Sequence, residues 1–164
     1  MNLRPAESND FDSLFEIYQE NHIGSGGQLV GDFFPSDCTY VAEVDNEIVA
    51  YVNILEHLPA RVTDETQIID PAYCFGQSTL YIKQIAVKKT HQNKGMGKQI
   101  YRALRELYPD AILYAFVDIR NSQSMRFHLR SSFLPIGVFE VSQFYTTANY
   151  TAFLLATKDT AKVS

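Results

Sequence analysis

The stretch LYIKQIAVKKTHQNKGMGKQIYRAL, residues Leu80 to Leu104, decides the fold. Its beginning is rich in β-branched and aromatic side chains and predicts a strand from Thr79 to Val87. Ile100 and Leu104 then recur at helical spacing and predict an amphipathic helix. A polar linker and a glycine-bearing turn, Gln92 to Gly97, separate the two elements. The stretch therefore predicts a strand that leads through a tight turn into a helix.

The residues after this stretch complete a strand, helix, strand unit. Pro109 ends the helix, and Ala111 to Val117 form an almost continuous apolar run. Such a run is typical of a strand that is buried on both faces, and a helical connection favours parallel pairing with a right-handed crossover. The sequence thus predicts an α/β domain.

Other segments add strands and helices on both sides of this unit. They are a short strand at Leu3, a helix that Ser8 or Asn9 could cap, strands at Thr39 to Val44 and Glu47 to Leu55 joined by a two-residue turn at Asp45-Asn46, a helix from about Ser122 to Ser132, and strands at Leu134 to Val141 and Tyr150 to Thr157.

The bulk composition narrows the class of protein. With 164 residues, 46% hydrophobic and 20% charged, the chain fits one core, and no apolar run reaches the roughly 20 residues of a membrane span. The start shows no secretory or transit pattern, so we expect a soluble, cytoplasmic protein. A net charge of -5 argues against nucleic acid as a partner. Cys38 and Cys74 lack metal-site spacing, so we expect reduced thiols and no metal site.

The turn from Gln92 to Lys98 has the chemistry of an anion site. The first N–H groups of a helix lack partners within the helix, and the helix dipole is positive at this end. Gly95 and Gly97 carry no side chain, so a diphosphate can approach the backbone, while Lys94 and Lys98 add positive charge. An ordinary glycine-bearing helix start explains the same string about equally well.

Two other nucleotide motifs fit this turn less well. A Walker A loop fails because Gln99 follows Gly97-Lys98 and position 92 is not glycine. A dinucleotide fingerprint matches Gly95 and Gly97 but has Ile100 at its third glycine position. Asp118, at a plausible distance for ribose binding, keeps this alternative open.

Two blocks of this sequence resemble the GCN5-related N-acetyltransferase (GNAT) family. The coenzyme A loop of that family reads Gln/Arg-x-x-Gly-x-Gly/Ala, which Gln92, Gly95 and Gly97 match. The family's second block, Asn-x-x-Ala/Ser-x-x-Phe/Leu-Tyr-x-x-x-Gly-Phe, is matched at Asn121, Ser124, Phe127 and Phe133. Together the two blocks are far more specific than either one, and the order of elements agrees over nearly the whole chain.

The resemblance implies a site for an acyl-coenzyme A. The backbone of one strand would pair with the pantetheine arm by strand addition, the loop N–H groups would hold the pyrophosphate, and the second block would border the arm. Simple core packing is as good an explanation for Phe127. The implied cofactor-binding residues are Ile85, Ala86, Val87, Gln92, Asn93, Lys94, Gly95, Met96, Gly97, Lys98, Asn121, Ser124 and Phe127.

The catalytic groups depart from the family pattern. His128 stands where many relatives carry the tyrosine that protonates the leaving thiolate, and Ser132 stands where they carry glycine. His128 is the candidate acid, although a hydrogen-bonded histidine without a catalytic task is the alternative. Positions 81 to 85 hold no carboxylate, so Glu56 and Asp118 are the nearest candidate bases. We interpret Cys74 as a structural or loop thiol.

The resemblance also implies the fold and the reaction. We expect an α/β acetyltransferase-like fold over residues 1–157, with a central mixed sheet of six or seven strands flanked by helices on both faces, and a tail at 158–164. The expected reaction is direct transfer of an acetyl group from acetyl-coenzyme A to a primary amine on a small molecule or a protein. A non-catalytic acyl-coenzyme A sensor is the alternative. We expect segments 24–32 and 56–77 to select the acceptor, no membrane partner, and a homodimer as the candidate assembly.

Overall fold

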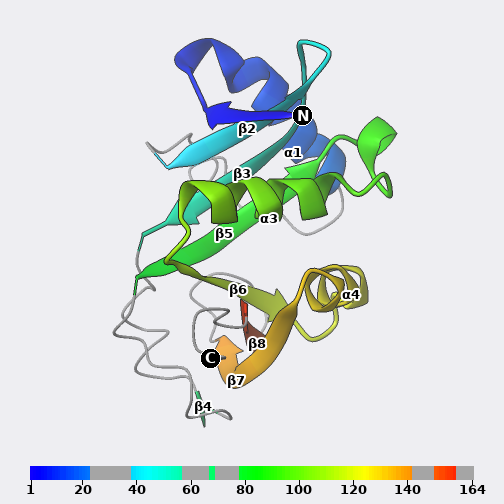
Figure 1. The fold of residues 1–164 in the computed structure, drawn as a ribbon. Helices are drawn as coiled ribbons and strands as arrows, with labels where there is room; N and C mark the ends of the chain where they lie inside the picture. Colours follow the sequence, from blue (N-terminus) through cyan, green and yellow to red (C-terminus); the bar gives the residue numbers. More distant parts are fainter. Residues whose placement is uncertain (23–37, 57–66, 69–77, 142–149, 158–164) are drawn as a thin grey trace. The chain divides into compact units, whose positions relative to one another are not determined.

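The computed structural model describes residues 1–22, 38–56, 67–68, 78–141 and 150–157 (Figure 1). In chain order its elements are β1 (Asn2–Pro5), η1 (Ser8–Asp10), α1 (Phe11–His22), β2 (Thr39–Val44), β3 (Glu47–Leu55), β4 (Gln67–Ile68), β5 (Thr79–Val87), η3 (Lys89–His91), α3 (Met96–Leu107), β6 (Ile112–Asp118), α4 (Ser122–Arg130), β7 (Phe133–Val141) and β8 (Tyr150–Thr157).

The described strands form one mixed sheet in the order β1-β2-β3-β5-β6-β8-β7-β4. Strands β5 and β6 run parallel, as the strand, helix, strand pattern predicted. The pairs β1–β2, β2–β3, β4–β7, β6–β8 and β7–β8 are antiparallel. All seven predicted strands are present. The sequence pattern did not predict β4, a two-residue strand in which Gln67 pairs with Val138. The predicted α/β fold is confirmed.

The hairpin between β2 and β3 follows directly from its turn residues. Asp45 and Asn46 have φ values of 51° and 65°, and Val44 pairs with Glu47. Positive φ at both central residues defines the turn whose twist matches that of paired strands, and Asp and Asn tolerate this conformation better than most residues. The predicted two-residue turn is confirmed.

The chain forms two compact units. The first comprises Met1–Ile54 and Lys83–Pro109, and the second comprises Leu55–Ile82 and Asp110–Ser164. Strand β5 therefore contributes its first four residues to the second unit and its last five to the first.

The first unit encloses its sheet strands between two helices. Helix α1 buries Leu14, Ile17 and Tyr18 against Val41, Tyr51 and Ala86, which come from β2, β3 and β5. Figure 1 shows α1 and α3 on opposite faces of these strands. This explains why β3 is buried almost throughout, from Val49 to Ile54. Helix α3 buries Met96, Ile100, Tyr101 and Leu104 along one face.

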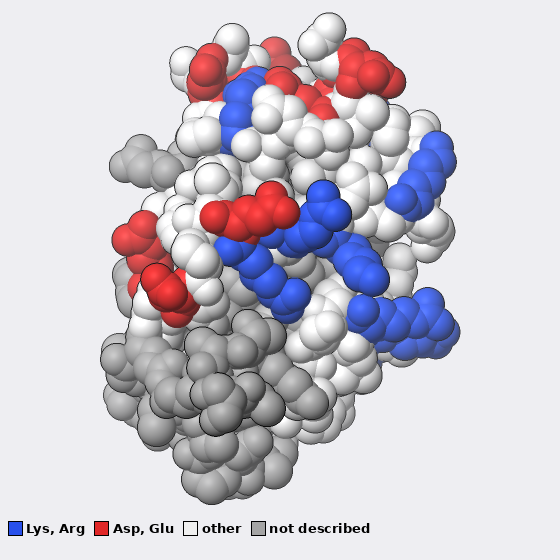
Figure 2. Space-filling model, viewed as in Figure 1, with Lys and Arg blue, Asp and Glu red and all other residues white. Residues whose placement is uncertain are grey.

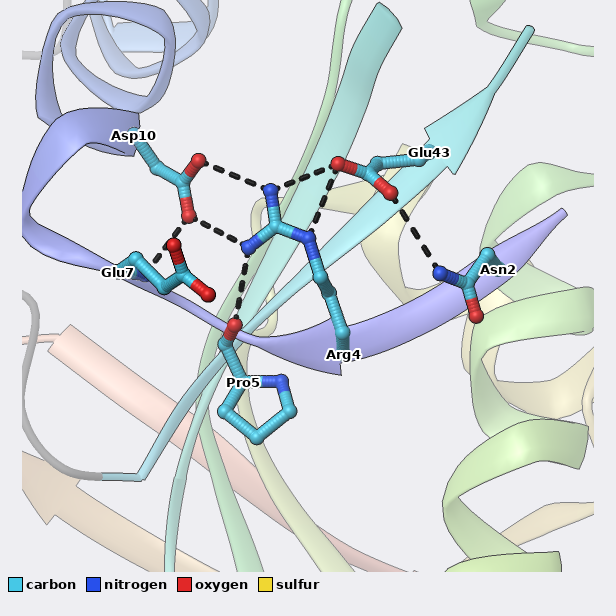
Figure 3. Close-up of polar contacts among 6 residues, drawn as sticks. All are labelled: Asn2, Arg4, Pro5, Glu7, Asp10 and Glu43. Atoms are coloured by element: carbon cyan, nitrogen blue, oxygen red, sulfur yellow. Dashed lines mark hydrogen bonds and ion pairs between the residues drawn. The ribbon is translucent and has the colours of Figure 1, made fainter. Parts of the chain in front are cut away.

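An ion-pair cluster fixes the start of the chain to the entry of α1 (Figure 3). Arg4 on β1 donates two hydrogen bonds to the carboxylate of Asp10, at 2.8 and 3.0 Å, and also contacts Glu43 on β2 at 2.7 Å. The Asp10 carboxylate also accepts the backbone N–H of Glu7 at 2.7 Å. The chain therefore enters η1 and α1 at Glu7, so Ser8 and Asn9 are not the cap that the sequence pattern suggested.

The second unit is built on a ladder of β6, β8 and β7. Tyr114 to Asp118 pair with Ala156 to Ala152, and β8 in turn pairs along β7. Its core contains Ile112, Tyr114, Ile136, Leu154 and Ala156. Helix α4 ends at Arg130, two residues before the predicted Ser132, because Ser132 has a φ of 68° and cannot continue the helix.

Candidate functional site

The turn before α3 has an unusual backbone. Asn93 and Gly95 both lie in the left-handed region, with φ values of 61° and 79°, and α3 begins at the next residue, Met96. The first helical hydrogen bond runs from the N–H of Gln99 to the carbonyl of Gly95 at 3.1 Å. The preceding N–H groups, those of Met96, Gly97 and Lys98, belong to the first turn, which has no acceptor within a helix. A left-handed residue followed by helical residues is also the backbone pattern of anion-binding nests.

The space in front of this turn suits a diphosphate. Gly95 is the N-cap residue and so contributes no side-chain acceptor to the helix end. A Cβ placed on Gly95 would meet no atom within 4 Å, so this side of the turn is open. Lys94, which precedes Gly95, and Lys98, in the first turn of α3, are exposed. The N–H groups, the helix dipole and the two ammonium groups therefore fit the polyanionic part of a coenzyme A.

The two glycines of the turn differ in whether their backbone conformation favours glycine. Gly95 is the one glycine of the described residues with a positive φ, so its backbone conformation favours glycine. Gly97 is the second residue of α3 and lies outside that region, so its conformation suits any residue. A requirement for glycine at position 97 would therefore not come from its backbone conformation.

Basic side chains surround this part of the first unit. Helix α3 carries Lys98, Arg102 and Arg105 on its exposed face, and Arg102 is paired with Glu106 at 3.4 Å. Figure 2 shows Lys and Arg gathered over the face of the molecule that carries α3, although the chain as a whole has a net charge of -5. Local charge therefore favours an anion here.

The last residues of β5 lie beyond the segment that pairs with β6. The register of β5 with β6 runs from Thr79 paired with Ile112 to Ile82 paired with Ala115, so Ile85, Ala86 and Val87 lie beyond its end. The carbonyl oxygen of Val87 accepts two side-chain amides, from Asn21 at 3.1 Å and from Gln92 at 3.0 Å. Both lone pairs of that oxygen are thereby used within the protein.

The second predicted block lies in the second unit, at the start of α4. Asn121 is the N-cap residue, and its side-chain oxygen accepts the N–H of Ser124 at 3.0 Å. The amide nitrogen of Asn121 is thus the part of its side chain that can donate to a ligand. Ser124 and Phe127 are partly buried. The predicted cofactor residues therefore fall in both compact units, residues 85–98 in the first and residues 121–127 in the second.

His128 is one of the most enclosed polar residues described. It is 3% exposed, and its ring contacts the rings of Phe127 and Phe133 edge to face, with centroids 5.0 and 5.1 Å away. Nδ1 lies 2.8 Å from the carbonyl oxygen of Ser124, and a carbonyl can only accept, so Nδ1 carries a proton. Burial lowers the pKa of His128 despite this hydrogen bond. The imidazole is therefore neutral at pH 7.

The candidate bases have less suitable surroundings. The Asp118 carboxylate accepts hydrogen bonds from the backbone and the guanidinium of Arg120, the shortest at 2.6 Å. These contacts hold the pKa of Asp118 below its usual range, which weakens it as a proton acceptor. Glu56 is exposed. Cys74 and most of the predicted acceptor segments, 24–32 and 56–77, lie outside the described residues.

Sequence reasoning missed two residues of α1 that contact the segment from Val87 to Gln92, which leads into the turn. The side chain of Asn21 contacts both Val87 and Gln92, and the carboxylate of Glu20 accepts the N–H of Lys89 at 2.8 Å. These partners lie 66 to 71 positions apart in the chain. The periodicity of α1 marks its apolar face only, so nothing in the local pattern pointed to them.

The fold and the glycine turn define an α/β protein in which a helix start has the backbone pattern of an anion site. The sequence pattern described as "Acetyltransferase (GNAT) family" matches residues 5–133. The chain belongs to the GNAT acetyltransferase family. No curated protein matches the chain by sequence.

Solved structures agree with the fold. A GNAT acetyltransferase from Streptococcus agalactiae superposes with a TM-score of 0.71 at 13% identity, covering 96% of this chain and 95% of its own. Arabidopsis thaliana NAA60 in complex with acetyl-CoA gives 0.66 at 18% identity, covering 94% and 97%. Ribosomal-protein-alanine N-acetyltransferase from Brucella melitensis gives 0.62 at 16% identity, covering 95% and 98%. At these identities the likeness concerns the fold alone.

Proposed function

We propose that this protein transfers an acetyl group from acetyl-coenzyme A to a primary amine by direct attack. The observation that carries the proposal is the open turn at Gly95, where a Cβ would meet no atom within 4 Å, the first turn of α3 begins, and Lys94 and Lys98 are exposed. Membership of the GNAT family supports the acetyl group as the part transferred.

Each part of the cofactor has a proposed holder. The backbone N–H groups from Asn93 to Lys98 hold the diphosphate, with Lys94 and Lys98 as flanking charges. The N–H of Gln92, which the sequence also suggested, donates instead to the Lys89 carbonyl at 3.3 Å. The backbone of Ile85 to Val87 pairs with the pantetheine arm. The Val87 oxygen already accepts two amides, so Ile85, Ala86 and the N–H of Val87 carry that pairing. Asn121, Ser124 and Phe127 border the arm.

The proposed reaction requires few side-chain groups. The thioester supplies the acetyl group, a C–N bond forms, and the C–S bond breaks. A backbone N–H on the Ile85 to Val87 segment stabilises the negative charge that develops on the carbonyl oxygen. An amine that arrives neutral releases one proton to water after the C–N bond forms and so needs no protein base, which agrees with the lowered pKa of Asp118.

The departing thiolate needs one proton, and we propose water as its donor with His128 as the alternative. The neutral His128 ring uses its Nδ1 proton on the Ser124 carbonyl, and proton release from Nε2 would require a charged imidazolium in a buried, apolar setting. These surroundings favour a positioning role for the histidine.

A non-catalytic acyl-coenzyme A sensor is the second candidate. Two observations motivate it: the candidate base Asp118 is ion-paired with Arg120, and the candidate acid His128 is buried. Both candidates predict cofactor binding, so turnover separates them. Thiol release from acetyl-coenzyme A should be measured with small amines, amino acids, aminoglycoside antibiotics and peptides with free amino groups. Release above the protein-free background with any acceptor supports the enzyme, and calorimetric binding without release across the panel supports the sensor.

The organisation of the chain is part of the proposal. We propose that residues 1–157 form the catalytic domain, that residues 158–164 are a tail, and that the protein acts in the cytoplasm. In the described part of the chain, no helix is both long and apolar enough to cross a bilayer. A homodimer is the candidate assembly.

A further inference from the structure

The end of α1 is tied to the segment between β5 and α3 by three contacts within the first unit. Asn21 donates from its amide nitrogen to the carbonyl of Val87 at 3.1 Å. Gln92 donates to the side-chain oxygen of Asn21 at 3.0 Å. Glu20 accepts the backbone N–H of Lys89 at 2.8 Å. Side chains of a helix far away in sequence thus reach both ends of the linker between β5 and the turn.

Asn21, Gln92 and Val87 form a closed triangle of hydrogen bonds. The Gln92 amide donates to both the Val87 carbonyl and the Asn21 oxygen, and the Asn21 amide donates to the same Val87 carbonyl. The remaining N–H of Asn21 donates to the Ile17 carbonyl at 2.8 Å, so the asparagine is anchored on its own helix. Such a closed set leaves the Gln92 side chain one orientation.

The triangle lies at the start of the turn that precedes α3. Gln92 is the first residue of the turn, and α3 begins four residues later, at Met96, with its first-turn N–H groups. A binding loop that is ordered before the ligand arrives loses less entropy on binding. The side chain of Gln92 is engaged with Asn21 and Val87, and its N–H donates to the carbonyl of Lys89 at 3.3 Å, so Gln92 serves to position the residues that follow it in the turn.

We infer that Asn21, supported by Glu20, is a positioning residue that holds the Gln92 to Lys98 turn in its anion-binding conformation. This inference rests on the proposed function, since the anion is the diphosphate of coenzyme A. Asn21 acts through Gln92 and Val87 and does not touch the ligand itself.

The first test measures ligand binding. Asn21→Ala removes the three side-chain hydrogen bonds of Asn21, to Ile17, Val87 and Gln92. Gln19→Ala is the matched control, because Gln19 is an exposed residue of the same helix. We expect Asn21→Ala to raise the Kd of acetyl-coenzyme A by about tenfold. The Kd of S-acetyl-pantetheine, which lacks the diphosphate, should change less than twofold. A Gln92→Ala substitution should add little to Asn21→Ala, because both remove the same triangle.

The second test needs no ligand. Amide hydrogen exchange of the free protein should be faster in Asn21→Ala at the N–H groups of His91 and Gln99, which donate to Lys88 and Gly95. Exchange in β2 and β3 should match that of Gln19→Ala. If wild-type protein fails to bind acetyl-coenzyme A, the proposed function is wrong, and the exchange result still decides whether Asn21 orders the turn. Unchanged exchange at these two amides, or equal loss of affinity for both ligands, would overturn the inference.

Discussion

Replacing Gly97 by valine should weaken acetyl-coenzyme A binding while leaving the stability of the fold nearly unchanged. Gly97 is the second residue of α3 and has no positive φ, so valine can adopt its backbone conformation. In a helix, glycine is about 1 kcal/mol and valine about 0.6 kcal/mol less favourable than alanine. The substitution should therefore change the free energy of unfolding by only a few tenths of a kcal/mol, and Tm by about 2 °C or less.

The loss of binding follows from the first-turn N–H groups. A hydrogen bond from backbone to a charged phosphate contributes about 1.5–3 kcal/mol. If the branched side chain displaces the diphosphate from one such N–H group, affinity should fall by roughly 10- to 100-fold. Isothermal titration calorimetry gives Kd, and a thermal scan of the same preparation gives Tm.

Two companion substitutions make the result interpretable. Gly97→Ala should bind acetyl-coenzyme A within about threefold of wild type and be more stable by up to about 1 kcal/mol, since the family motif accepts alanine there. Gly95→Ala should lose about 1 kcal/mol of stability, because φ is 79° at that position. An unchanged Kd for Gly97→Val, or a Tm that falls in step with its affinity, would refute the role assigned to this turn.

Three further predictions concern stability and proton transfer. Ser132 has a φ of 68° at the end of α4, so Ser132→Gly should raise the free energy of unfolding by about 0.5–1 kcal/mol; a lower urea midpoint would contradict this. The hydrogen bonds from Arg4 lower the pKa of Asp10, so the stability they contribute is present above the unfolded pKa of about 3.9 and is lost as pH falls through the folded pKa. Asp10→Ala should therefore lower the free energy of unfolding by about 2 kcal/mol at pH 7, and this deficit relative to wild type should shrink below pH 4. A deficit that is equal at pH 7 and below pH 4 would argue against the linkage. With water as the proton donor, His128→Phe should keep kcat within about threefold between pH 6 and 9, and a fall of roughly 10²- to 10⁴-fold in kcat at unchanged cofactor affinity would instead identify His128 as the acid.

Local chemistry made much of the fold and the loop predictable. The positive φ values of Asp45 and Asn46 follow from residue types within a few positions of each other, and so does a helix start near the glycines, although α3 begins at Met96 and not after Gly97 as predicted. The parallel pairing of β5 with β6 follows from the helix that joins them. In each case the residues that determine the local structure lie in the same segment as that structure.

Features that depend on distant segments could not be predicted in the same way. The pairing of Gln67 with Val138 and the contact of Asn21 with Gln92 join residues about 70 positions apart. Spacing identified His128 as a candidate acid, but its burial depends on packing against Phe133 in the following strand. Sequence reasoning therefore found the position and missed the environment that decides its protonation.

The most direct test of acetyl-coenzyme A binding at the start of α3 is a titration of isotope-labelled protein followed by backbone amide resonances. The amides of Met96, Gly97 and Lys98 should shift most on adding acetyl-coenzyme A and should stay unchanged on adding NADH at the same concentration. A response to NADH instead, or shifts from acetyl-coenzyme A that leave these three amides unaffected, would contradict the account.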